Sequence, residues 1–230
     1  MEILIVSATE FEIKPILQHF NINTKSNNLF FHNYKNLNIS VLITGITYPL
    51  LMYKLTKVLN KNKFDLIINA GIAGSYNNNL NTGSIVNVKS EVFSDMIIED
   101  NEKIYTLFEK GLININEFPY INGELINNTI YNNKVINNLP KVKAVTSNTL
   151  HGNKVNIEKI KQIFQPDIET MEGAGFFYVC ISEKIPFFQI RGISNFVEPL
   201  NKEKWDIKTP IININNTILE ILDEESNKFE

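Results

Sequence analysis

Two carboxylates and a lone arginine stand close together near the end of the sequence. Glu169 and Glu172 open an apolar run, and Arg191 lies in the β-type run that follows. Arg191 is the one arginine among the 230 residues. Residues three apart share a face of a helix, and buried carboxylates need partners. We therefore expect Arg191 to act as a structural clamp on one carboxylate, with Glu169 as the candidate, while substrate hydroxyls bind the other.

Acidic residues at a helix start also complement the helix dipole, which is a purely structural explanation for this pair. The run after Glu172 carries no charge before Glu183, which favours a buried helix over a surface helix. Asn195 follows Arg191 just past the β-type run. Asn suits a turn, but its amide also offers a donor and an acceptor to one edge of a heterocycle.

Glu12 and the segment Gly71–Ser75 each follow an apolar run of strand type. Glu12 completes the capping-box pattern that begins at Thr9, so a structural role competes with a catalytic one. The segment Gly71–Ser75 reads GIAGS and matches neither a dinucleotide fingerprint nor a P-loop. The segment fits a tight turn and equally fits a loop whose small residues let a ligand approach the backbone closely. In α/β folds, ligands bind where strands end, so both are candidate site elements.

No cofactor and no metal are expected from this sequence. The three histidines, His19, His32 and His151, are isolated and lack the spacing of metal ligands. Cys180 is the one cysteine, which excludes a disulfide within the chain and favours a small buried apolar residue over a catalytic one.

Composition favours a globular protein with one domain over residues 1–230. The chain is 43% hydrophobic with net charge -3, and its scattered lysines argue against nucleic acid as a partner. No apolar run approaches the ~20 residues of a membrane span. The first residues resemble a strand rather than a signal peptide, which predicts a cytoplasmic protein with no membrane partner.

Strand-type runs alternate with helical patterns, which predicts a three-layer α/β/α fold with a mixed central sheet. The pair Leu29–Tyr34 and Leu37–Ile43 reads as a hairpin and makes the sheet mixed. Residues 93–139 are Asn-rich and read as a long excursion. The other expected strands are 2–6, 66–68, 85–88, 142–146 and 187–190, and the expected helices are 13–20, 50–59, 157–164, 173–183 and 211–222.

Four motifs in order carry a family resemblance over most of the chain. They are SATEFE at 7–12, NAGIAGS at 69–75, ETMEGA at 169–174 and RGISNFVEP at 191–199. They resemble the nucleoside phosphorylase/nucleosidase superfamily and, within it, the futalosine hydrolases, relatives of the 5'-methylthioadenosine/S-adenosylhomocysteine nucleosidases. The resemblance implies a nucleoside phosphorylase-like fold, a purine nucleoside substrate and a homodimer whose partner often completes the pocket.

The resemblance also implies roles for individual residues. Glu12 matches the carboxylate that activates water, and Asn195 stands where the methylthioadenosine enzymes have an Asp that protonates the purine at N7. Met171 and Glu172 match residues that hold the ribose, and Leu150 lies in the loop that matches the cover of the base. The substrate-binding residues expected on this basis are Ala73, Gly74, Leu150, Met171, Glu172 and Phe196.

Two departures from the superfamily favour a futalosine hydrolase. Phosphorylases hold phosphate with arginines that this chain lacks, and planar phosphate recognition suits arginine best, so water is the expected nucleophile. Asn195 in place of Asp favours a 6-oxopurine, because an ionised carboxylate would repel the O6 lone pairs. The implied reaction releases hypoxanthine and dehypoxanthine futalosine from futalosine, on the futalosine route to menaquinone.

Three alternatives stay open from the sequence: a 5'-methylthioadenosine/S-adenosylhomocysteine nucleosidase, a purine nucleoside phosphorylase, and a non-enzymatic nucleoside-binding relative. The wall of the pocket around the 5' substituent is also open. Its candidates are Phe11, Tyr48, Phe93, Phe108 and Phe196.

Overall fold

Strands and helices alternate along most of the chain, and the computed structural model describes residues 1–24, 28–101, 103–199, 203 and 205–228. The strands are β1 (Glu2–Ser7), β2 (Leu29–Tyr34), β3 (Leu37–Ile43), β4 (Leu66–Ser75), β5 (Ile85–Phe93), β6 (Ile97–Asp100), β7 (Lys103–Thr106), β8 (Leu125–Ile126), β9 (Lys141–Thr146), β10 (Ile168–Thr170) and β11 (Phe187–Phe196). The helices are α1 (Glu10–His19), α2 (Tyr48–Leu59), α3 (Lys134–Asn138), α4 (Lys154–Phe164), α5 (Gly173–Ser182) and α6 (Lys208–Asn227).

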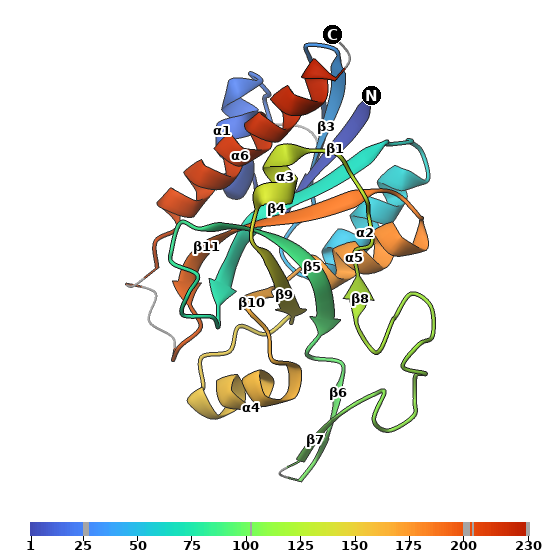
Figure 1. The fold of residues 1–230 in the computed structure, drawn as a ribbon, viewed down its shortest axis with the longest axis vertical. Helices are drawn as coiled ribbons and strands as arrows, with labels where there is room; N and C mark the ends of the chain where they lie inside the picture. Colours follow the sequence, from blue (N-terminus) through green and yellow to red (C-terminus); the bar gives the residue numbers. More distant parts are fainter. Residues whose placement is uncertain (25–27, 102, 200–202, 204, 229–230) are drawn as a thin grey trace.

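The described strands form one large sheet and a small hairpin of β6 and β7 (Figure 1). The large sheet has the order β10-β9-β5-β11-β4-β1-β3-β2, with β8 paired to β5. Strand β1 runs parallel to β3 and β4, and β4 runs parallel to β11, whereas β2 and β5 run antiparallel to β3 and β11. The sheet is therefore mixed, as predicted.

Strand β10 pairs with two strands at once. It runs parallel to β9 and antiparallel to β4, where Glu169 lies opposite Gly74. These pairings connect the β9 edge of the sheet back to β4. A side chain from β10 is thereby brought beside the carboxyl end of β4.

Helices cover both faces of the sheet, which confirms the three-layer prediction. On one face, Leu55 of α2 and Phe176 of α5 belong to one apolar cluster, and α2 packs against α5. On the other face, Ile13 of α1 and Ile218 of α6 belong to a second cluster, and α1 packs against α6. Strand residues alternate between the clusters, so Leu4 faces the first and the neighbouring residues face the second.

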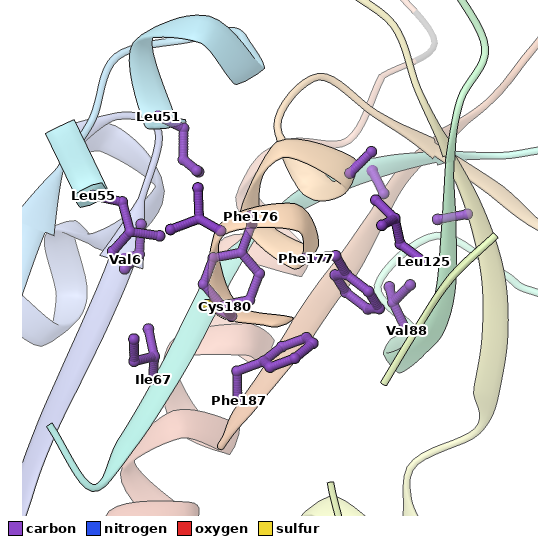
Figure 2. Close-up of a cluster of buried hydrophobic side chains, with 14 of the residues drawn as sticks. Val6, Leu51, Leu55, Ile67, Val88, Leu125, Phe176, Phe177, Cys180 and Phe187 are labelled. Atoms are coloured by element: carbon purple, nitrogen blue, oxygen red, sulfur yellow. The ribbon is translucent and has the colours of Figure 1, made fainter. Parts of the chain in front are cut away.

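The aromatic centre of the first cluster lies under α5 (Figure 2). Phe176 and Phe177 are fully buried and meet the ring of Phe187 edge to face, at centroid distances of 5.5 and 4.8 Å. Cys180 is a free, fully buried thiol in the same cluster, in agreement with its expected role as a small apolar residue. This apolar packing fixes α5, and with it the side chains at its first turn.

Strands β4 and β11 are longer than the sequence predicts. The apolar runs suggest ends at Ile68 and Ile190, but the two strands pair in parallel as far as Ser75 and Phe196. The interpretation of Gly71–Ser75 as a turn or loop is therefore wrong. Its backbone has ladder partners through most of the segment, and small side chains suit a strand that is crowded by neighbours.

The excursion at 93–139 is largely irregular, with the hairpin β6–β7, the short β8 and α3 as its regular parts. Among the described residues, no helix is both long and apolar enough to cross a membrane. The same residues contain no group of three or more His, Cys, Asp or Glu side chains placed to hold a metal ion.

Candidate functional site

A cavity of about 300 Å³ lies at the carboxyl ends of β1, β4 and β11. Its walls also include the turn between β10 and α5 and the loop after β9. This is the place where an α/β sheet usually binds its ligand. Seven of the eight residues predicted for the site line the cavity: Glu12, Ala73, Gly74, Leu150, Met171, Glu172 and Asn195.

The eighth predicted residue, Phe196, is not among the described residues that line the cavity; it is 38% exposed at the end of β11. Of the aromatic candidates for the 5' wall, Phe11 lines the cavity. Tyr48 and Phe93 stack edge to face on each other instead, 4.9 Å apart. Trp205 also lines the cavity, although no sequence pattern pointed to it.

Glu12 completes the capping box that the sequence predicts, and it also lines the cavity. It occupies the third position of α1, where Thr9 donates its backbone N–H (3.1 Å) and its hydroxyl (2.8 Å) to Oε2. The other oxygen, Oε1, accepts the backbone N–H of Ile72 at 3.1 Å. The capping box is thus present, and it holds the carboxylate rigidly at the cavity wall.

Arg191 lies behind this wall and is 2% exposed. It is paired with Gly71 in the β4–β11 ladder, and a Cβ at Gly71 would lie 2.5 Å from Arg191 Nη1 and 2.9 Å from Glu12 Oε1. The absence of a side chain at Gly71 therefore lets the guanidinium approach Glu12. Burial lowers the pKa of Arg191, and the charges of Glu172, Glu12 and Glu91 oppose that shift.

The expected pair of Arg191 with Glu169 is wrong. The carboxylates that act on Arg191 are Glu172, Glu12 and Glu91, whereas Glu169 Oε2 accepts the hydroxyl of Tyr76 at 2.8 Å. Glu169 also does not lie on a helix with Glu172, because it belongs to β10 and α5 begins only at Gly173. In β10, the side chain of Glu169 lies beside Gly74.

Glu172 stands immediately before α5 and is 8% exposed. Its Oε1 accepts the backbone N–H of Thr47 at 2.8 Å. The residue that donates this hydrogen bond, Thr47, has φ of 89°, which is a strained backbone conformation for a β-branched residue. Burial raises the pKa of Glu172 to about 7, while Arg191 and the Thr47 amide act to lower it.

A fully buried carboxylate, Glu91, lies beneath the first turn of α5. It accepts hydrogen bonds from Gln189 Nε2 (2.6 Å), Thr146 Oγ1 (2.9 Å) and Thr170 Oγ1 (3.3 Å). The two threonine hydroxyls in turn accept the backbone N–H groups of Ala174 (2.8 Å) and residue 173 (3.1 Å). Glu91 thus supports the helix start that carries Glu172.

Glu91 was not among the residues predicted for the site. The sequence predicts this strand only to Val88, whereas β5 continues to Phe93 and so places Glu91 inside the sheet, where a buried charge requires partners. Burial raises its pKa to about 7 against the effect of its donors and of Arg191. The partners come from β9, β10 and β11, so no local pattern could identify them.

Asn195 and Glu169 face each other across Gly74. A Cβ at Gly74 would lie 3.2 Å from Glu169 Cγ and 3.4 Å from Asn195 Nδ2. Asn195 is not a turn residue but part of β11, next to a register shift after Ile193. Its Oδ1 accepts the hydroxyl of Ser194 at 2.8 Å, and its Nδ2 donates to the carbonyl of residue 196 at 3.0 Å.

Glu169 is the third carboxylate of the cavity wall, after Glu12 and Glu172. Burial raises its pKa to about 7, and the hydrogen bond from Tyr76 acts to lower it.

In the loop after β9, Leu150 lines the cavity and is 43% exposed, whereas His151 is not among the described lining residues. Burial lowers the pKa of His151, and the charge of Asp95 opposes this shift.

The mixed sheet and its carboxylate-lined cavity define an α/β protein with a candidate small-ligand site at the strand ends. The Phosphorylase superfamily model matches residues 2–222, and the chain belongs to this superfamily.

The proteins to which this chain is similar are named for several different activities. The chain is 26% identical over 238 residues to a 5'-methylthioadenosine/S-adenosylhomocysteine nucleosidase of Buchnera aphidicola, covering 95% of this chain and 94% of the relative. It is 26% identical over 222 residues to an aminodeoxyfutalosine nucleosidase of Campylobacter jejuni, with 93% of each covered. The solved structure of a futalosine hydrolase of Helicobacter pylori superposes with a TM-score of 0.77 at 19% identity, covering 97% of this chain and 98% of that chain.

Replacement of Gly173 by alanine tests the support beneath α5. The new Cβ would overlap Glu91 Oε1 and lie 2.6 Å from Gln189 Nε2. We expect Gly173→Ala to lower the free energy of unfolding by about 1–3 kcal/mol in urea denaturation, although alanine favours a helix over glycine.

The double variant Glu91→Ala/Gly173→Ala is the control, because it removes the overlapping oxygen. The alanine at 173 should cost less in that background than in the native one. A Gly173→Ala protein as stable as the native chain would refute the packing that we describe.

Proposed function

We propose that the protein is a nucleosidase that hydrolyses the N-glycosidic bond of futalosine, releasing hypoxanthine and dehypoxanthine futalosine on the futalosine route to menaquinone. Residues 1–230 would form its single nucleosidase domain. The observation that carries the proposal is the placement of Glu12, Glu172 and Asn195 around one cavity. The similarity to two nucleosidases supports the hydrolytic class, and one of these carries aminodeoxyfutalosine in its name.

The charge of the cavity supports water rather than phosphate as the nucleophile. Its wall contains the carboxylates of Glu12, Glu169 and Glu172, and none of the described lining residues is Lys, Arg or His. The one arginine is buried and faces three carboxylates. Against the described part of this wall, a phosphate dianion would meet like charge with no cation beside it.

The proposed mechanism divides the work between the two ends of the cavity. As hypoxanthine departs, positive charge grows on the ribose, as in glycoside hydrolysis generally. Glu172 grips the ribose hydroxyls beside Met171 and stabilises this charge, while Glu12 orients and deprotonates water. Asn195 stabilises the charge that develops on the purine, with Ala73 and Gly74 allowing close approach and Leu150 covering the base.

Asn195 supports a 6-oxopurine as the leaving base. Its Nδ2 can donate to O6 while its Oδ1 accepts the N7–H of the departing base, whereas a carboxylate would repel O6. The rival with the most support is a 5'-methylthioadenosine/S-adenosylhomocysteine nucleosidase, because such a relative matches nearly the whole chain. A purine nucleoside phosphorylase and a non-enzymatic nucleoside-binding protein are the further alternatives.

A base-release assay distinguishes these functions. The protein is mixed with futalosine, methylthioadenosine or inosine, with and without phosphate, and the free base is detected. We expect hypoxanthine from futalosine without phosphate. Preferential release of adenine would favour the methylthioadenosine enzyme, a phosphate requirement would favour a phosphorylase, and no release from any nucleoside would contradict an enzymatic role.

Glu12→Gln should lower kcat for futalosine by about 10²–10⁴-fold, because general-base catalysis contributes that much. The amide keeps the size of the side chain, so KM should change little. Glu10→Gln is the matched control, since Glu10 lies in the same helix turn, is exposed and does not line the cavity. Steady-state kinetics at native rates in Glu12→Gln would remove Glu12 from the mechanism.

Asn195→Asp should lower kcat/KM for futalosine by about tenfold to a hundredfold, since a mismatched buried polar pair costs about 1–3 kcal/mol. The acidic side chain suits adenine better, so turnover of methylthioadenosine should rise relative to futalosine. Asn101→Asp, on the exposed turn between β6 and β7, adds the same charge away from the cavity and serves as the control. Unchanged futalosine kinetics in Asn195→Asp would refute the assigned role.

We propose further that two copies of the chain form a homodimer next to the cavity. Support comes from large exposed apolar side chains there: Phe11 (56% exposed) and Ile46 (50%) on the cavity wall, with Leu50 (49%) and Tyr53 (67%) on α2. Light scattering should give the mass of two chains, and Tyr53→Asp should shift it toward one. A native protein that is monomeric while it turns over substrate would contradict the dimer.

A further inference from the structure

The cavity holds one carboxylate that the proposed mechanism does not use. Glu169 lines the cavity on β10, apart from the Glu12–Arg191–Glu172 cluster. Its Oε2 accepts the hydroxyl of Tyr76, and among the described residues no donor reaches Oε1. A carboxylate oxygen on the wall of a ligand cavity is placed to accept a hydrogen bond from a donor on the ligand.

The neighbour of Glu169 identifies the part of the ligand that it would meet. Glu169 Cγ and Asn195 Nδ2 both approach the same point above Gly74. The two side chains therefore lie on either side of Gly74, a residue of β4 that has no side chain to separate them. A flat heterocycle that contacts Asn195 with one edge presents an adjacent edge to Glu169.

We propose that Glu169 determines specificity by accepting the N1–H of a 6-oxopurine through Oε1, beside the contact of Asn195 with the same base. This inference rests on the proposed function, because it takes the ligand to be a purine nucleoside. A 6-oxopurine has a hydrogen on N1, whereas a 6-aminopurine has a lone pair there. An ionised carboxylate accepts hydrogen bonds and cannot donate, so it favours the first and repels the second.

Tyr76 gives this assignment its geometry. Its ring is buried, and its hydroxyl holds Oε2 at 2.8 Å, which fixes the carboxylate plane and leaves Oε1 as the free acceptor. A purely structural role for Glu169 would be to retain Tyr76. The two roles differ in one measurable respect. Loss of a structural support would lower the affinity for 6-oxopurines and 6-aminopurines alike, whereas loss of a specificity contact would lower the affinity for 6-oxopurines alone.

Titration calorimetry with free hypoxanthine and free adenine tests the proposal on the full chain. The native protein should bind hypoxanthine more tightly than adenine. In Glu169→Gln, Tyr76 can still donate to the amide oxygen, while the amide N–H₂ turns a donor toward the base. Hypoxanthine affinity should then fall by about tenfold to a hundredfold, and adenine affinity should hold or rise.

Tyr76→Phe is the matched control, because it removes the partner of Oε2 and leaves Oε1 in place. It should preserve the preference for hypoxanthine. An equal loss of both bases in Glu169→Gln, an unchanged preference, or no binding of either base to the native protein would overturn the proposal. Base binding does not require bond cleavage, so a failure of hydrolysis in the nucleoside assay remains distinguishable from a failure of this assignment.

Discussion

The buried charge of Arg191 is the constraint on which the rest of the site depends. A guanidinium away from water needs carboxylates close by, and Glu12, Glu91 and Glu172 act on it from three separate parts of the chain. The start of α1, strand β5 and the start of α5 are therefore gathered around one residue of β11. Two glycines make this possible, because a side chain at Gly71 or Gly173 would meet the charged groups themselves.

Support for the site extends from this centre into apolar packing. The first turn of α5 is held from below by the threonine hydroxyls that bind Glu91, and the remainder of the helix is anchored by Phe176 and Phe177. Glu172 therefore stands beside a helix start that is held by buried hydrogen bonds and by apolar packing. Thr47 can be held in a strained backbone conformation opposite it because its surroundings are rigid.

The sequence was sufficient for the class of fold and for seven of the residues that line the cavity, because periodicity and short motifs are local properties. The hairpin of β2 and β3 matches the prediction residue for residue. The pairings were a different matter: the extension of β4 to Ser75 depends on β11 and β10, and the strand position of Glu169 depends on β9 and β4. The partner of Arg191 was misassigned for the same reason, since sequence proximity to Glu169 gave no information about which face of the sheet each residue occupies.

The same charge balance that stabilises the fold suits the proposed chemistry. Burial and the nearby charge of Glu12 favour the protonated form of Glu172, and Arg191 opposes both from behind the cavity wall. A cation placed there helps to keep Glu172 ionised without occupying the cavity or offering a phosphate site. An ionised carboxylate that is already fixed in place stabilises positive charge on a ribose without reorganising during the reaction. In the proposed hydrolysis, the single arginine would act through the carboxylates that it neutralises in part, without touching the substrate.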